Sequence, residues 1–140
     1  MESRSPLVYF LGNRPLWEGR YADLWSIAHF VAGTLIAYVL MRIGIGFWPG
    51  LGIAVLIGVV WELFEKFTKL SATEYATNNV TDVLFSSLGF IIAFHVFSAP
   101  LALLVRHGIL IALALVFIGT DILGWVSYTY YRSADAGITS

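Results

Sequence analysis

Hydrophobic residues along the chain gather in four long runs that are separated by short segments rich in polar residues, glycine and proline. The runs cover residues 24–41, 49–67, 80–99 and 109–131. Each run approaches the ~20 residues that an α-helix needs to cross ~30 Å of hydrocarbon. Asp23 is a suitable N-cap for the first run, Pro49 suits a first helical turn, and Pro100 ends the third run. The pattern therefore predicts an all-α fold, an integral membrane bundle of four transmembrane helices.

The composition indicates a single membrane domain over residues 1–140. The chain is 59% hydrophobic and only 12% charged, with a mean hydropathy of +0.81, and four spans leave too few residues for a second, soluble domain. The stretch Leu7–Trp17 is too short to span a membrane and is interrupted by Arg14 and Pro15. We expect this N-terminal stretch to lie against the membrane surface as an interfacial segment. Cysteine is absent, which excludes disulfides and thiolate chemistry.

The distribution of charge predicts the orientation of the bundle. With four spans, both termini and the middle loop lie on one side, which carries six of the eight basic residues; Arg42 and Arg106 lie on the other. The positive-inside rule then places both termini in the cytoplasm. The net charge of −1 provides no basic surface, so we expect no nucleic acid among the partners.

Ionisable residues inside the apolar runs are the best candidates for function, because each costs about 2.5–3.5 kcal/mol on insertion scales. Counting 1.5 Å per residue places His29 ~9 Å from the cytoplasmic edge, and Glu62 and Asp121 ~12 Å from it. Glu65 and Asp82 lie closer to the same edge. Each predicted helix therefore contributes an ionisable group to the inner leaflet.

These ionisable residues share helix faces with small residues, since positions three and four apart lie on one side of a helix. His29 aligns with Gly33, Glu62 with Gly58, and Asp82 with Ser86. Small residues let helices approach closely in lipid, so we expect these faces to point inward around a polar pocket that opens towards the cytoplasm. The predicted ligand-binding residues are His29, Glu62, Glu65, Asn79, Asp82, Ser86 and Asp121.

Three interpretations of this cluster stay open. It can be an interhelical hydrogen-bond network that only stabilises the bundle, a pocket for a polar ligand, or a site for Mg²⁺, Mn²⁺, Zn²⁺ or iron built from oxygen and imidazole ligands. The sequence contains no recognised metal motif and no activated nucleophile. We therefore assign no catalytic residue, no metal ligand and no cofactor, and favour binding over catalysis.

Four short motifs resemble the VanZ-like membrane proteins and the small bacterial families close to them. In chain order they are Asp23-Leu-Trp-Ser-Ile-Ala-His29-Phe, Trp61-Glu62-Leu-Phe-Glu65, Asn78-Asn79-Val-Thr-Asp82 and Ser86-Ser-Leu-Gly89. The resemblance covers roughly residues 23–95 and implies that His29, Glu62, Asp82 and Gly89 are signature positions. Ser86 departs from the pattern, because the family usually has Asn there. The resemblance also implies a bacterial inner membrane as the location.

The leading hypothesis from the sequence is a small multi-pass protein whose inner-leaflet pocket binds a polar or lipid-linked headgroup. One alternative is an accessory or structural subunit of a larger membrane complex, which the small size and the near absence of soluble mass favour. A second alternative is a metal-dependent enzyme that acts on lipid or envelope precursors. The expected partners are membrane lipids, together with a larger complex or further copies of this chain.

Overall fold

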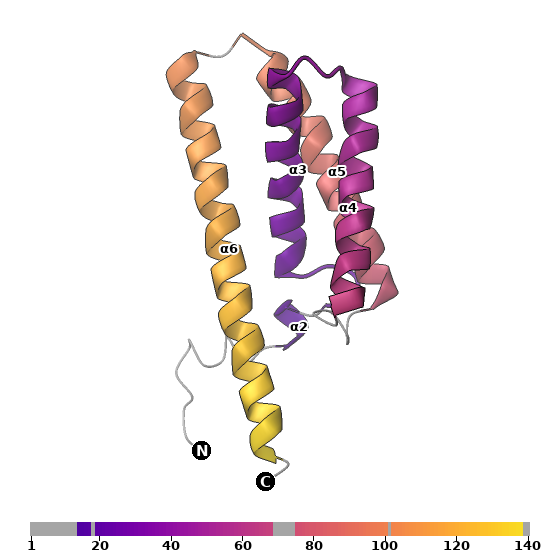
Figure 1. Cartoon of the computed structure of the whole chain (residues 1–140). Helices are drawn as coiled ribbons and strands as arrows, with labels where there is room; N and C mark the ends of the chain where they lie inside the picture. Colours follow the sequence, from indigo (N-terminus) through magenta and orange to yellow (C-terminus); the bar gives the residue numbers. More distant parts are fainter. Residues whose placement is uncertain (1–13, 18, 69–74, 101, 139–140) are drawn as a thin grey trace.

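The computed structural model describes residues 14–17, 19–68, 75–100 and 102–138, and this part of the chain is helical without strands. The elements in chain order are α2 (Arg14–Trp17), α3 (Leu24–Arg42), α4 (Phe47–Thr68), α5 (Ala76–Ser98) and α6 (Leu103–Ile138) (Figure 1). The last four are long and apolar enough to cross a membrane, as a multi-pass integral membrane protein requires. The predicted all-α fold with four such helices is confirmed. Of the predicted interfacial segment Leu7–Trp17, residues 7–13 lie outside the described residues, and the rest forms α2.

Two helices extend beyond the apolar runs that predicted them. Helix α5 begins at Ala76, four residues before the run, and α6 continues to Ile138, seven residues beyond it. Hydrophobicity marks only the part of a helix that faces lipid or core. At the start of α5 the polar side chains of Thr77 and Asn78 instead find hydrogen-bond partners near the start of α3, which allows the helix to begin earlier.

Consecutive long helices run in opposite directions (Figure 1). The N-termini of α3 and α5 and the C-terminal parts of α4 and α6 therefore lie at one end of the bundle, together with α2; we call it the α2 end. At the opposite end α3 turns into α4 through Gly44, whose φ of 82° lies in the left-handed region that glycine tolerates. The Gly44 amide donates to the Met41 carbonyl at 3.1 Å and closes the turn.

Helices α3 and α5 make the closest contact in the bundle. A Cβ atom added at Gly33 would lie 1.9 Å from the carbonyl oxygen of Ser86, and one added at Gly89 would lie 2.0 Å from that of Phe30. Backbone therefore touches backbone in both directions. This is the small-residue packing by which helices associate in lipid, where no hydrophobic force separates the interface from the lipid-facing surface.

The two sides of this crossing differ in character. Towards the end opposite α2 lies an apolar cluster of buried side chains: Ala37, Ala54, Phe90, Ala93 and Phe97. Towards the α2 end, the buried side chains of α3, α4 and α5 include Ser26, Glu62, Asn78, Asn79 and Asp82. Helix α6 packs along this bundle, with Gly124 against the Trp25 ring and Leu113 against the apolar cluster. The bundle thus positions a polar cluster near one membrane surface.

Candidate functional site

The site begins at the N-terminus of α3. Asp23 is the N-cap, and its Oδ1 accepts hydrogen bonds from the amides of Trp25 at 2.9 Å and Ser26 at 3.3 Å. The Ser26 hydroxyl accepts from the Asp23 amide in return, which completes a capping box. The same hydroxyl donates to Asp82 Oδ1 on α5 at 2.5 Å. The cap that starts α3 therefore also fixes one oxygen of Asp82.

Asn78 joins this cap to α5 a second time. Its Nδ2 donates to Asp23 Oδ2 and to Asp82 Oδ2, both at 3.1 Å, so both amide protons are used. Asn78 is fully buried. Asn78 was not among the predicted pocket residues, because the predicted polar face of this helix passed through Asn79, three residues before Asp82. Its spacing of four residues from Asp82 was the signal that could have identified it.

His29, Glu62 and Asp82 converge from three different helices. His29 Nε2 lies 3.6 Å from Glu62 Oε1 and 3.9 Å from Asp82 Oδ2. One potential ligand atom from each of the three residues lies within 4.8 Å of the other two. Glu62 and Asp82 are 6% and 1% exposed, so the carboxylates face each other in a largely water-free environment. We call these three residues the triad.

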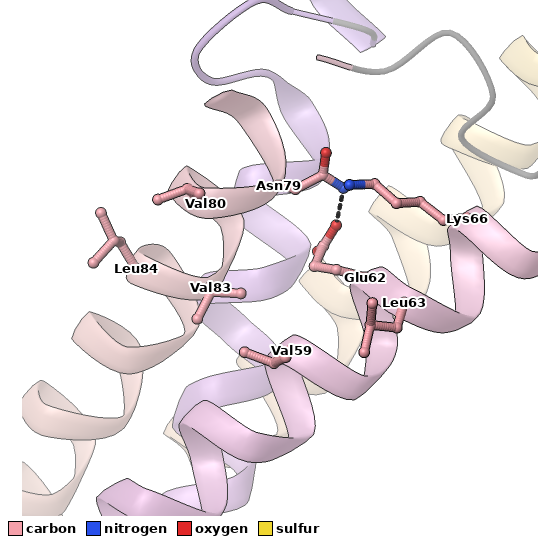
Figure 2. Close-up of a pocket in the computed structure, with 8 residues that line it drawn as sticks. All are labelled: Val59, Glu62, Leu63, Lys66, Asn79, Val80, Val83 and Leu84. Atoms are coloured by element: carbon pink, nitrogen blue, oxygen red, sulfur yellow. Dashed lines mark hydrogen bonds between the residues drawn. The ribbon is translucent and has the colours of Figure 1, made fainter. Parts of the chain in front are cut away.

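Glu62 also forms the polar end of a groove between α4 and α5 (Figure 2). Asn79 Nδ2 donates a hydrogen bond to Glu62 Oε2, and Lys66 lies beside this pair. The groove has a volume of about 270 Å³. Its remaining walls are apolar and are formed by Val59, Leu63, Val80, Val83 and Leu84. The groove thus combines a hydrocarbon-like wall with three polar side chains at one end.

The other predicted site residues lie in different surroundings. Glu65 Oε1 accepts a hydrogen bond from Trp61 Nε1 at 2.7 Å on the exposed side of α4. Ser86 is buried one turn from Asp82. Gly33 contacts the backbone of Ser86, not its hydroxyl. Asp121 is half-buried on α6. Within the described ranges, the group with metal-ligand spacing consists of the triad and includes neither Glu65 nor Asp121.

No family model, curated protein or solved structure matches this chain. The resemblance to VanZ-like proteins therefore stays a prediction, carried by the motifs alone.

The arrangement suits binding better than covalent chemistry. The Ser26 hydroxyl is committed to Asp82 and to the helix cap, so it is not positioned as a nucleophile activated by His29. The triad can hold a cation or exchange a proton, and the groove can hold an amphipathic molecule. The triad and the groove share Glu62, whose Oε2 accepts a hydrogen bond from Asn79 and whose Oε1 faces His29.

Proposed function

We propose that this protein binds a membrane phospholipid, with the headgroup at Glu62, Asn79 and Lys66 and an acyl chain along the α4–α5 groove. The observation that carries the proposal is the division of the groove into apolar walls and one polar end (Figure 2). A phospholipid has the same division, and a groove within spanning helices opens to the bilayer from which the lipid enters.

The polar end is suited to a phosphate-containing headgroup. Lys66 supplies a positive charge near the membrane surface, worth about 1 kcal/mol towards an anionic headgroup. Asn79 is 6% exposed, and its Oδ1 has no hydrogen-bond partner among the described residues. A buried acceptor of this kind is rare in folded proteins, and a hydroxyl or ammonium of a headgroup would satisfy it.

We further propose that the chain is a VanZ-like protein of a bacterial inner membrane with its α2 end in the cytoplasm, the side that the basic residues favour. The bound lipid would then come from the inner leaflet. A role for the chain as a lipid-binding subunit of a larger complex is compatible with the same groove.

The test measures lipid binding to delipidated protein in mild detergent by native mass spectrometry. The probes are dioleoylphosphatidylglycerol and, as a lipid without a phosphate, dioleoylglycerol. Leu84→Trp places a large ring in the groove at an exposed position, and Leu88→Trp is the matched control, one turn away on the same exposed side of α5 and outside the groove. We expect Leu84→Trp to weaken phosphatidylglycerol binding at least about tenfold, equivalent to about 1.4 kcal/mol. Leu88→Trp is expected to bind like the wild type.

Lys66→Gln tests the headgroup separately from the groove. Losing about 1 kcal/mol predicts about fivefold weaker binding of phosphatidylglycerol and no change for dioleoylglycerol. Equal binding of both lipids to all variants would contradict the proposal. Extraction of the chain only within a larger complex, with no lipid adduct, would favour the accessory-subunit hypothesis instead.

A further inference from the structure

The triad has the dimensions of a metal site. With His29 Nε2 3.6 Å and 3.9 Å from the two carboxylate oxygens, and the ligand atoms within 4.8 Å of one another, a point equidistant from all three lies within about 2.4 Å of each. Bonds from Zn²⁺ to imidazole nitrogen and carboxylate oxygen are ~2.0–2.2 Å long. Shifts of a few tenths of an ångström would bring all three atoms to bonding distance.

Neighbouring side chains orient both carboxylates towards His29. Ser26 donates to Asp82 Oδ1, Asn78 to Asp82 Oδ2 and Asn79 to Glu62 Oε2. In this orientation Asp82 Oδ2 and Glu62 Oε1 are the oxygens nearest the imidazole. Such hydrogen bonds from outer residues are what aligns ligands around a metal ion. The donors are a hydroxyl and two amides, all neutral, so these contacts leave the charge of the carboxylates unchanged.

An independent observation points to a ligand beside the triad. The Oδ1 atom of Asn79 is a buried acceptor without a partner in the described part of the chain, and Asn79 is hydrogen-bonded to Glu62. This oxygen points away from Glu62 (Figure 2), so a donor bound beside the Asn79–Glu62 pair, such as a water molecule, would satisfy it. Hydrogen bonds among the triad residues do not satisfy the Asn79 Oδ1 acceptor.

We infer that His29, Glu62 and Asp82 bind one divalent transition-metal ion of the Zn²⁺, Mn²⁺ or Fe²⁺ class. One imidazole with two carboxylates is a mixed nitrogen and oxygen set, which suits these ions better than Mg²⁺ or Ca²⁺, whose sites are built from oxygen. With both carboxylates ionised and the imidazole neutral, as metal ligation requires, the triad carries a charge of −2 that a single divalent ion balances.

The ion would also change what the groove can bind. Three protein ligands leave coordination positions open for water or a phosphate oxygen. A phospholipid phosphate could then meet both Lys66 and the ion, although Glu62 carries a negative charge. This last step rests on the proposed function, whereas metal binding by the triad does not.

The experiment measures metal binding to the purified full-length protein with each metal alone: Zn²⁺, Mn²⁺ and, as a control ion, Mg²⁺. Stoichiometry comes from elemental analysis after desalting, and affinity from competition with a chelator. We expect about one Zn²⁺ or Mn²⁺ per chain and binding of Mg²⁺ at least about 100-fold weaker. Glu62→Gln and His29→Gln are expected to weaken Zn²⁺ binding by more than about 100-fold. Glu65→Gln is the matched control on the same helix and is expected to bind like the wild type.

A measurement on the wild type keeps the inference falsifiable if a triad variant fails to fold. X-ray absorption of the Zn²⁺-loaded protein is expected to show one imidazole among its ligands at ~2.0–2.2 Å. Coordination without imidazole, or Zn²⁺ binding that Glu62→Gln leaves unchanged, would overturn the inference. Folding of each variant is checked by its helical circular dichroism and its elution as a single species.

The two proposals fail separately. Leu84→Trp blocks the groove and leaves the triad intact, so it is expected to retain the metal while losing phosphatidylglycerol. If the wild type bound the metal but no lipid, the proposed function would be contradicted and the metal inference would not. Lipid binding without a metal would contradict this inference and leave the triad as a hydrogen-bonded network between helices.

Discussion

The two ends of the α3–α5 pair pack together through different kinds of side chain. Beyond the crossing of Gly33 and Gly89, towards the end opposite α2, the helices are held by alanine and phenylalanine. On the α2 side, the same helices meet through Ser26, Asn78 and Asp82. Burying ionisable groups in a membrane protein is costly, and the apolar end shows that this pair of helices packs without them. The polar end is therefore where a function beyond packing is to be expected.

The largest effect is expected at the crossing that joins the two ends. Gly89→Ala adds a Cβ that would lie 2.0 Å from the Phe30 carbonyl oxygen, and backbone cannot move aside as a flexible side chain can. We expect a loss of more than about 3 kcal/mol in the free energy of unfolding, because both helices must separate. The measurement is reversible unfolding in detergent.

Gly108→Ala is the matched control for this substitution. Gly108 is an exposed position in α6, and an added Cβ would meet no atom within 4 Å. Replacing glycine by alanine inside a helix raises stability by up to about 1 kcal/mol. Equal effects of the two substitutions would show that α3 and α5 do not touch through their backbones.

The second-largest effect is expected at the apolar end, where a substitution should change packing and leave binding unchanged. Phe90 is fully buried, and its ring fits against Gly50 of α4. Phe90→Ala is expected to lower the free energy of unfolding by about 3 kcal/mol through the cavity that it leaves. Binding of Zn²⁺ and phosphatidylglycerol to the folded fraction is expected to stay within a factor of about two, since neither site involves this end. A parallel loss of stability and of both ligands would contradict the division of the bundle into two functional ends.

The sequence predicts some of these features and not others. The hydrophobic runs predict the number of spanning helices, because length and hydropathy are properties of each segment alone. A common leaflet and shared faces with small residues predict that His29, Glu62 and Asp82 approach one another, as they do in the structure. Asn78 was missed because the predicted face passed through Asn79, and the hydrogen bonds of Asn78 to Asp23 and Asp82 depend on how α5 meets the cap of α3, which spacing along one helix does not show.

Glu65 shows the limit of reasoning from helix faces. Three residues after Glu62 it lies near the same face, but the Trp61 indole N–H lies one turn away and binds its carboxylate on the exposed side. Spacing alone does not choose between two neighbouring partners. The groove was likewise unpredictable in detail, because its shape depends on how closely Gly58 lets α4 approach Val83 of α5.

A smaller effect is expected from the hydrogen bond that links the α3 cap to the polar end. Ser26→Ala removes the donor to Asp82 Oδ1 and half of the capping box. We expect a loss of about 1 kcal/mol, typical of an interhelical hydrogen bond within a membrane. Ser98→Ala is the control, because the Ser98 hydroxyl is exposed and, among the described residues, donates to the Phe94 carbonyl of its own helix. A change of less than about 0.3 kcal/mol in Ser26→Ala would contradict a stabilising role for this contact.

The smallest effect is expected at the boundary of the polar end. Glu65→Gln retains an oxygen that can accept from Trp61 Nε1, and the bond lies on an exposed surface. The change in the free energy of unfolding is therefore expected to stay within about 0.5 kcal/mol. Glu62→Gln, only three residues earlier, replaces a carboxylate that is 6% exposed and faces His29. If Glu65→Gln changed stability or Zn²⁺ binding as much as Glu62→Gln does, the polar site would extend around α4 to its exposed side. A small effect at Glu65 with a large one at Glu62 would place the edge of the site between these two glutamates.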